Sequence, residues 1–268
     1  MSASPALSRY KAELALMFEL AELAETIAIE RFRSPELVVE RKPDGSPVSD
    51  ADREVERVLR ARIAAERPGD AITGEELGES GDSEWRWYLD PIDGTSAYIA
   101  GGENWCTLIA LALRGQTQLA LVAAPCWHSR WLALRGDGAF RDGRRLHVST
   151  TARLAGATIG DDSNHTLARG VVDHPLAHLA AHAARVRPHR GLNFLSVAAG
   201  EIDACVSTAG SVWDYAPLEL IVQEAGGRFT DLAGRPGIAS GNALATNGAI
   251  HDEALQALRG PADGTGRT

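Results

Sequence analysis

The sequence contains only three cysteines in 268 residues, and no two of them form a CxxC pair. Cys106, Cys126 and Cys205 lie far apart in the chain, which excludes a disulfide-stabilised scaffold and a cysteine-based zinc or redox motif. We interpret them as reduced, buried small residues. This usage is typical of a cytoplasmic protein.

A long apolar segment and an excess of basic residues are also missing. No apolar run approaches the roughly 18 residues of a transmembrane helix, and the start of the chain lacks a basic segment followed by an apolar one. Lys and Arg number 27 against 36 Asp and Glu, a net charge of −9, so neither nucleic acid nor an anionic membrane is an expected partner. An acidic protein can still bind an anionic substrate where metal ions invert the local field.

The remaining composition, 44% hydrophobic and 24% charged, is that of an ordinary soluble globular protein. The pattern changes from β-rich to mixed near residues 149–154. We therefore divide the chain into an N-terminal half, residues 1–150, and a C-terminal half, residues 151–260. The Gly- and Thr-rich residues 261–268 are expected to form a flexible tail.

Apolar spacing and turn residues predict the secondary structure. Helices are expected at residues 5–32, 49–67, 176–184, 192–199, 214–225 and 250–258. Strands are expected at residues 71–73, 85–90, 105–113, 118–124, 130–136, 157–160, 202–207, 228–230 and 243–246. A polar loop, KPDGSPVS, is expected at residues 42–49.

The most informative stretch is WRWYLDPIDGTSAY, residues 85–98. Its apolar residues alternate along one face of a strand that then delivers Asp90 and Asp93. Two carboxylates this close repel each other, and burying them is costly unless a cation lies between them. Mg²⁺ or Mn²⁺ prefers such oxygen ligands together with substrate phosphate, to which Gly94 and Thr95 can offer backbone N–H groups. The stretch therefore predicts a metal-and-phosphate site.

Other acidic residues follow strand ends or begin helices, and each has a structural explanation. Asp52, three residues after Ser49, fits the acidic member of a helix capping box. Glu75 and Glu76 fit a solvated turn, and Asp214 fits a helix N-cap. Taken singly, none of these acids establishes a function.

A phosphatase of the haloacid dehalogenase type is a competing interpretation of two nearby Asp residues followed by Gly-Thr. That motif places its Asp residues two apart and near the chain start, whereas Asp90 and Asp93 are three apart and lie well inside the chain. Residues two apart share a face of a strand and residues three apart do not. The covalent aspartate mechanism is therefore the weaker interpretation.

Five motifs in the same order resemble the inositol monophosphatase family of Mg²⁺-dependent, lithium-sensitive phosphatases. They are KPDGSPVSDAD, GEE, LDPIDGT, WDYAPLELIVQEAGG and SGNALATNG, and the resemblance extends from about residue 42 to about residue 258. Within the family, SGNALATNGAIHDEAL is most similar to the bacterial histidinol-phosphate phosphatase branch.

The resemblance implies a layered αβαβα sandwich, with a large antiparallel sheet in the N-terminal half and a smaller mixed sheet in the C-terminal half. It implies hydrolysis of a small phosphate monoester by a metal-activated water, with two or three Mg²⁺ ions, or Mn²⁺, as cofactors. The partner is then a small phosphorylated metabolite, either histidinol phosphate or an inositol or polyol phosphate. A homodimer is also implied.

The resemblance further assigns metal ligands to matching residues. Glu75, Asp90 and the Ile92 backbone carbonyl would hold a first ion. Asp90, Asp93 and Asp214 would hold a second, with Asp90 bridging the two. Glu75 would also orient a water on a third, weaker metal.

The remaining implied roles concern water and phosphate. Asp52 and Thr95 would orient and deprotonate the attacking water, with Glu75 as a third catalytic residue. Gly94 and Thr95 would bind the phosphate, and Asp214 would also contact the substrate. No side-chain nucleophile is required.

Departures from the family pattern concern the substrate. The family usually continues Gly-Thr with a polar residue and Asn-Phe, where residues 96–98 are SAY, and it commonly has a Glu where Ser207 stands. Histidinol-phosphate phosphatases tend to carry an Asp in the region of residues 188–191, here PHRG. Arg187, His189 and Arg190 suit a second anionic or hydroxyl-rich group, or else lie on a solvated loop. A sugar phosphate or bisphosphate is therefore an open alternative, with Arg190 as a candidate substrate-binding residue.

Several other hypotheses stay open. His174, His178 and His182 recur at a spacing of four, which fits either a metal site or a solvated helix face. Cys126 beside His128 fits a thiol nucleophile or a structural cysteine. A non-catalytic, ligand-binding relative would lack one of the metal or water-activating residues, all of which are present. A nucleotide 3′-phosphatase would need a base-stacking pocket that no residue pattern identifies.

Overall fold

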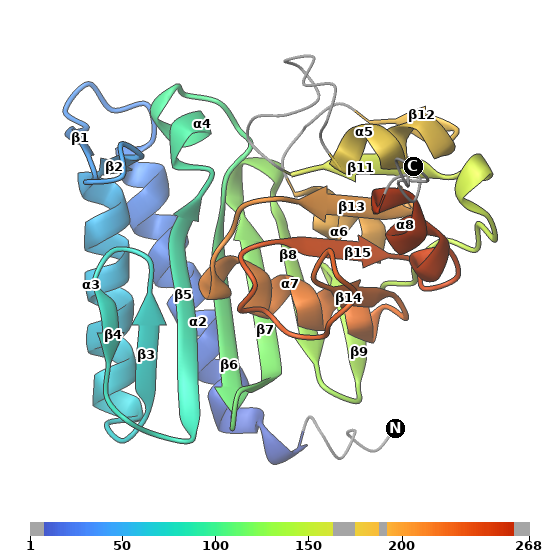
Figure 1. Ribbon diagram of the computed structural model, residues 1–268. Coiled ribbons are helices and arrows are strands. Elements are labelled where there is room, and N and C mark those ends of the chain that lie inside the picture. Colours follow the sequence, from blue (N-terminus) through green and yellow to red (C-terminus); the bar gives the residue numbers. More distant parts are fainter. Residues whose placement is uncertain (1–7, 163–174, 188–191, 260–268) are drawn as a thin grey trace, which may run out of the picture.

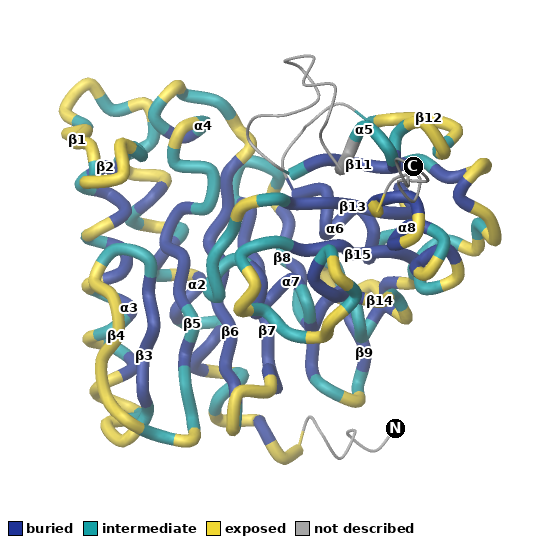
Figure 2. Tube along the Cα trace, in the orientation of Figure 1, coloured by how far each residue is buried: buried dark blue, intermediate teal, exposed yellow. Residues whose placement is uncertain are grey.

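The computed structural model describes residues 8–162, 175–187 and 192–259. Two sheets and three groups of helices alternate in five layers (Figure 1). Three clusters of buried apolar side chains fill the spaces between these layers. The central strands of both sheets are buried along most of their length (Figure 2). The expected αβαβα sandwich is confirmed. Within the described residues, every helix is too short or too polar to span a bilayer.

The first layer contains α2 (Lys11–Arg31) and α3 (Asp50–Glu66), which pack against one face of the larger sheet. Small and aliphatic side chains on one face of each helix supply the contact. Helix α3 follows Ser49, whose hydroxyl accepts a hydrogen bond from the Asp52 N–H, while the Asp52 carboxylate accepts one from the Ser49 N–H. The predicted capping box is confirmed.

The larger sheet has eight strands in the order β10-β9-β8-β7-β6-β5-β3-β4. They are β3 (Ala71–Gly74), β4 (Gly78–Ser80), β5 (Trp85–Asp93), β6 (Cys106–Leu113), β7 (Gln116–Ala124), β8 (Ser129–Leu134), β9 (Gly138–Arg141) and β10 (Arg144–Arg145). Neighbouring strands are antiparallel, except that β3 and β5 are parallel. As a result, β3 and β5 end at the same edge of the sheet, where the acidic motifs follow.

Helices α6 (Asn193–Ala198) and α7 (Val212–Glu224) form the middle layer between the two sheets. Helix α7 packs across β5 to β9 and begins beside the end of β5. A second capping box opens α7, because the Asp214 carboxylate accepts a hydrogen bond from the Ser211 N–H at 2.7 Å. Asp214 is therefore the acid of a capping box and Ser211 the N-cap, which corrects the simpler expectation that Asp214 is the N-cap itself.

The smaller sheet has the order β12-β11-β13-β15-β14, and α5 and α8 cover its outer face. These elements are β11 (Thr158–Asp161), α5 (Pro175–His182), β12 (Arg185–Val186), β13 (Ala204–Ser207), β14 (Arg228–Thr230), β15 (Ala243–Thr246) and α8 (His251–Leu258). Outside the layers lie a hairpin and short helices: β1 (Val39–Arg41), β2 (Pro47–Ser49), α4 (Thr95–Ile99), η1 (Pro125–Trp127) and η2 (Leu154–Gly156).

Most predicted elements are present, and most of the strands that were missed are exposed. Strands β1, β4, β10 and β12 were not predicted because their residues are exposed, so no alternation of apolar and polar residues marks them. Strand β9 was also missed, because it is only four residues long and lies between two glycine-containing turns. The predicted polar loop is shorter than expected, since its last three residues pair with β1 as β2. The predicted tail, residues 261–268, falls outside the described residues.

Candidate active site

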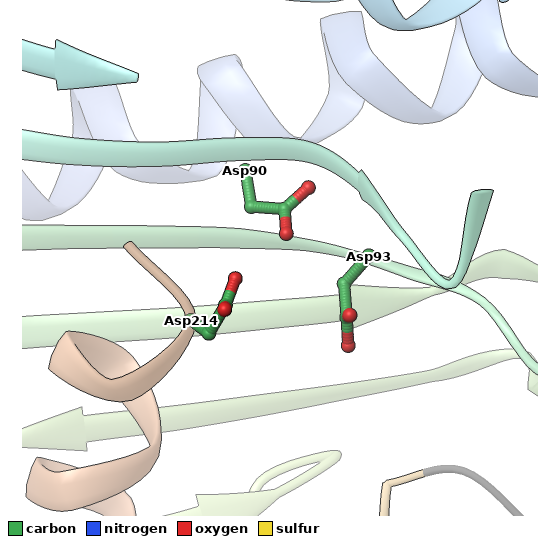
Figure 3. A group of neighbouring side chains, drawn as sticks. All are labelled: Asp90, Asp93 and Asp214. Carbon is green, nitrogen blue, oxygen red and sulfur yellow. The ribbon is translucent and has the colours of Figure 1, made fainter. Parts of the chain in front are cut away.

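Three carboxylates converge between the larger sheet and α7 (Figure 3). Asp90 and Asp93 come from the end of β5, and Asp214 comes from the first turn of α7. Each offers one oxygen, and these oxygens lie within 4.8 Å of one another. The structure therefore brings together three of the residues predicted as metal ligands.

An irregularity in β5 lets Asp90 and Asp93 point to the same place. In a regular strand, residues three apart face opposite sides of the sheet. The pairing of β5 with β6 shifts register between Asp90 and Asp93, and such a bulge re-aims a side chain. Pro91, which has no N–H for the strand ladder, lies within this irregularity. Its carbonyl accepts a hydrogen bond from the Thr107 hydroxyl at 2.8 Å.

Burial and mutual repulsion make the ionised cluster costly for the protein alone. Asp90 is 2% exposed, and its Oδ1 atom has no hydrogen-bond partner among the described residues. Burial, with the charges of Glu75, Asp93 and Asp214, raises the pKa of Asp90 well above its ordinary range. Burial and the charges of Asp214 and Asp162 raise the pKa of Asp93 to about 8, and burial raises that of Asp214 to about 6. Hard oxygen ligands in this state fit a divalent cation such as Mg²⁺.

Gly94 turns the chain from β5 into α4, and a side chain is excluded there for two reasons. Its φ of 87° lies in the left-handed region. A Cβ atom would also lie 2.6 Å from the Asn104 carbonyl oxygen. The backbone of Gly94 and the start of α4 at Thr95 are thus held directly beside Asp93, where the sequence predicted phosphate binding.

Asp52 combines the two roles that the sequence left as alternatives. Its Oδ2 atom accepts hydrogen bonds from the Ser49 N–H at 2.8 Å and the Ser49 hydroxyl at 2.5 Å. Its Oδ1 atom lies 3.2 Å from the Thr95 hydroxyl, which is also 3.0 Å from the Ile92 carbonyl oxygen. Burial raises the pKa of Asp52, although the hydrogen bonds from Ser49 and Thr95 oppose the shift. One carboxylate therefore both begins α3 and contacts Thr95.

Glu75 lies outside the group of three carboxylates and is paired with Lys42. The Lys42 Nζ atom is 2.7 Å from Glu75 Oε1 and 2.7 Å from Glu76 Oε1. Burial raises the pKa of Glu76 to about 7. Glu75 is still near enough for its charge to raise the pKa of Asp90. The pairing with Lys42, in the loop between β1 and β2, was not predicted.

A fully buried glutamate, Glu56 of α3, holds the backbone of this acidic turn. Its carboxylate accepts hydrogen bonds from the N–H groups of Glu76 at 2.7 Å and Leu77 at 3.1 Å. It also accepts one from Arg60 Nε at 2.7 Å. A Cβ atom on Gly74 would lie 2.1 Å from Glu56 Oε1, so the glycine leaves room for the carboxylate. Sequence reasoning missed Glu56 because it looks like any helix surface acid.

A pocket of about 150 Å³ opens beside the cluster. Asp93, Gly94 and Asp214 contribute to its lining, and Asp162, Phe194 and Tyr215 line it as well. Sequence reasoning did not single out Asp162, which follows β11. Two acids directly after a short predicted strand, Asp161 and Asp162, were the available signal.

The positions that depart from the family pattern lie in different surroundings. Ser207 lines the pocket, and its hydroxyl accepts a hydrogen bond from the Tyr215 hydroxyl at 3.0 Å. Tyr98 is fully buried in the apolar cluster under α2, so this departure belongs to the core and not to the substrate site. Arg187 lies 3.4 Å from Glu201 Oε2 and therefore already has an anionic partner.

The other candidates gain no support. His174, His189 and Arg190 lie outside the described residues. His182 Nδ1 contacts the His178 backbone carbonyl at 2.7 Å, within α5. Burial raises the pKa of Cys126, which disfavours a thiolate nucleophile.

Comparisons with known proteins give a consistent result. The pattern of the inositol monophosphatase family matches residues 11–261. A histidinol-phosphatase of Streptomyces coelicolor is 41% identical over 257 residues, covering 92% of this chain and 96% of that protein. A histidinol-phosphatase of Mycobacterium tuberculosis is 41% identical over 253 residues, covering 92% and 97%. The crystal structure of the extragenic suppressor protein suhB of Bartonella henselae matches with a TM-score of 0.85 at 30% identity, covering 94% of this chain and 100% of that one.

Proposed function

The chain belongs to the inositol monophosphatase family of Mg²⁺-dependent phosphatases, and from this premise we propose that it hydrolyses histidinol phosphate at the Asp90–Asp93–Asp214 cluster. The single observation that carries the proposal is the convergence of three buried carboxylates whose oxygens lie within 4.8 Å of one another. A protein gains no stability from such a group by itself. A divalent cation offsets its repulsion, so the cluster suits catalysis with a bound metal ion.

Each residue of the site then has a task. Asp90, Asp93 and Asp214 would hold Mg²⁺, with Glu75 as a further ligand. The ion, when bound, supplies a water of lowered pKa and a positive charge for the departing oxygen. The Thr95 hydroxyl, within hydrogen-bond reach of the Asp52 carboxylate, would orient the attacking water and pass its proton to Asp52.

Phosphate binding falls to the turn after β5. The positive φ of Gly94 and the start of α4 place backbone N–H groups next to Asp93 without a side chain in between. These N–H groups would donate hydrogen bonds to the phosphate oxygens. The pocket beside them would receive the alcohol part of the substrate.

The sugar bisphosphate alternative receives less support than histidinol phosphate. A second phosphate would need cationic partners. Among the described residues that line the pocket there is no Lys, Arg or His, and Arg187 faces Glu201 instead. Two relatives that share 41% of their residues with this chain are named histidinol-phosphatases.

A phosphate-release panel with Mg²⁺ tests the proposal. It should contain histidinol phosphate, inositol phosphates, sugar mono- and bisphosphates and nucleotide 3′-phosphates. We expect kcat/KM for histidinol phosphate to exceed every other value. A higher kcat/KM for a sugar bisphosphate would show that the protein is a phosphatase with a different substrate. No phosphate release from any ester would refute the proposal that the protein is a phosphatase.

Several finer expectations belong to the same proposal. We expect two or three Mg²⁺ ions per chain, with Mn²⁺ as a substitute, and calorimetric titration counts them. We expect a cytoplasmic homodimer. Light scattering of the purified protein measures its mass in solution and so tests the dimer. We retain the division into residues 1–150 and 151–260, which limited proteolysis between the halves tests.

A further inference from the structure

We propose that Glu56 is a positioning residue for the metal site, because it fixes the turn that holds Glu75 beside Asp90. The inference rests on the proposed function and deepens it. The Glu56 carboxylate is not one of the three that converge at the candidate active site. It would act on metal binding through the backbone of the residues that follow Glu75.

The burial of Glu56 is the first argument. Its side chain is fully buried, whereas that of its partner Arg60, one helical turn later, stays partly exposed. Glutamate and arginine four residues apart on a helix ordinarily pair at the surface. Burying such a charge is costly, and a buried ion pair is by itself a weak source of stability. The position of Glu56 therefore needs an explanation beyond its ion pair with Arg60.

The second argument is that Glu56 holds the two peptide groups that follow Glu75. The Glu76 N–H donates to Glu56 Oε2 at 2.7 Å, and the Leu77 N–H donates to Oε1 at 3.1 Å. Hydrogen bonds to a charged acceptor are strong, and they weaken steeply when the donor turns away. A shift of the carboxylate would break both bonds. Glu56 therefore sets the orientation of both peptides.

The strand β5 holds the same turn from its other side. Gly74 lies opposite Leu89 in the parallel pairing of β3 with β5, and the Glu75 N–H donates to the Leu89 carbonyl at 3.2 Å. Leu89 immediately precedes Asp90, so Glu75 and Asp90 leave neighbouring strands at one edge of the sheet. The backbone is thus anchored on both sides of Glu75, by β5 before it and by Glu56 after it.

Helix α3 supplies this anchor from the face that also carries Asp52. Asp52, Glu56 and Arg60 recur at a spacing of four, and residues four apart share one face of a helix. Asp52 contacts Thr95 beyond the end of β5. Arg60 donates to the Ser80 hydroxyl at 3.0 Å, in β4. One helix therefore fixes the proposed water-activating pair and the turn after β3 relative to each other.

Calorimetric Mg²⁺ titration of a double-mutant cycle tests this role. Glu56→Gln keeps the shape of the side chain but replaces one acceptor oxygen with an NH₂ group that can only donate. We expect the dissociation constant of Mg²⁺ to rise about 10-fold, the usual effect of losing a group that orients a metal ligand. Glu75→Gln should raise it at least as much. The double variant should match Glu75→Gln within about twofold, because Glu56 acts through Glu75.

Glu13→Gln is the matched control for the loss of a glutamate that pairs with arginine. Glu13 is partly buried and accepts a hydrogen bond from Arg67 at 2.7 Å, beyond the far end of α3. Its replacement should leave the dissociation constant within about twofold of wild type. Additive losses in the double variant would show that Glu56 only supports the fold and would overturn the inference. An unchanged constant in Glu56→Gln or in Glu75→Gln would overturn it as well.

Gly74→Ala keeps the test decisive if Glu56→Gln does not fold. A Cβ atom at Gly74 would collide with the Glu56 carboxylate, so the variant displaces this group without removing its charge. We expect the same rise of about 10-fold, absent when Glu75→Gln is already present, and an unchanged constant would overturn the inference. Phosphate release is a separate measurement. Wild type that binds Mg²⁺ but hydrolyses no ester would refute the proposed function, and the calorimetric cycle would still decide the inference.

Discussion

Asp90 and Asp231 are almost equally buried, at 2% and 1% exposure, yet their surroundings shift their pKa values in opposite directions. Burial and neighbouring carboxylates raise the pKa of Asp90. Burial would also raise that of Asp231, but hydrogen bonds from Arg235, Ser240 and the Ala233 N–H lower it below its ordinary value. A buried carboxylate with its own donors is a structural element, and one surrounded by other acids is prepared for a cation.

The region around Asp231 is complete without a ligand. Its carboxylate accepts from the N–H groups of Ala233 at 2.9 Å and Arg235 at 2.8 Å, and from Arg235 Nε at 2.7 Å. Close by, His251 lies between the hydroxyls of Thr230 at 3.0 Å and Thr246 at 2.9 Å. Both polar groups are satisfied inside the protein, so we expect them to act on stability and not on catalysis.

Asp93→Asn should have the largest effect on activity, because it removes one carboxylate of the acidic cluster that contains Asp90. The variant keeps the shape of the side chain but weakens cation binding, so phosphate release with Mg²⁺ should fall about 10³-fold. The same change removes repulsion in the metal-free protein, so the unfolding free energy in EDTA should stay equal or rise. Unchanged phosphatase activity would show that the carboxylate cluster is not the catalytic centre.

Asp231→Ala should produce the reverse result. Two backbone N–H groups and a guanidinium lose their acceptor, so the unfolding free energy should fall by about 3 kcal/mol. The kcat of the folded fraction should stay within about twofold of wild type. Urea unfolding and phosphate release measure the two quantities, and a loss of kcat larger than the loss of folded protein would connect this turn to the active site.

Mg²⁺ should stabilise wild type through the acidic cluster. At a concentration of about 100 times the dissociation constant, linkage gives about 2.7 kcal/mol of added stability. Thermal unfolding with Mg²⁺ and with EDTA measures the shift. The shift should disappear in Asp93→Asn and persist in a mildly destabilised Asp231 variant; an equal shift in both would place the ion elsewhere.

The smallest expected effect is a loss of stability on acidification that arises from His251. Burial and Arg228 lower its pKa from 6.5 to about 4, while Asp252 opposes the shift and is itself paired with Arg228 at 2.7 Å. Between these values the unfolded chain binds a proton that the folded chain does not, so stability falls as pH drops through this window.

His251→Asn provides the comparison for that pH effect. The variant lacks the titrating ring, so its stability should change less than that of wild type between about pH 7.5 and 4.5. Urea unfolding at both pH values measures the stability change of each protein. Subtracting the change of the variant from that of wild type cancels the contributions of the other titrating groups. An identical pH dependence would mean that His251 accepts its proton in the folded state as easily as in the unfolded chain.

Much of this protein was readable from local sequence patterns. The capping box at Ser49 and Asp52 involves residues three apart, and the short strands β14 and β15 match their predicted ranges. The motif with Asp90 and Asp93 indicated a metal site because two acids at one strand end have no structural purpose. Each of these signals depends on neighbours in the chain, whose geometry the backbone restricts.

The sequence by itself therefore determined most of the elements, the reaction class and the acids predicted as metal ligands. Only the tertiary structure decided how those acids are used. Packing of α7 across the larger sheet brings Asp214 close to Asp90 and Asp93. The loop between β1 and β2 instead brings Lys42 into an ion pair with Glu75. The physical reason is that a carboxylate's character depends on the charges and donors within a few ångströms, and packing between distant segments supplies these.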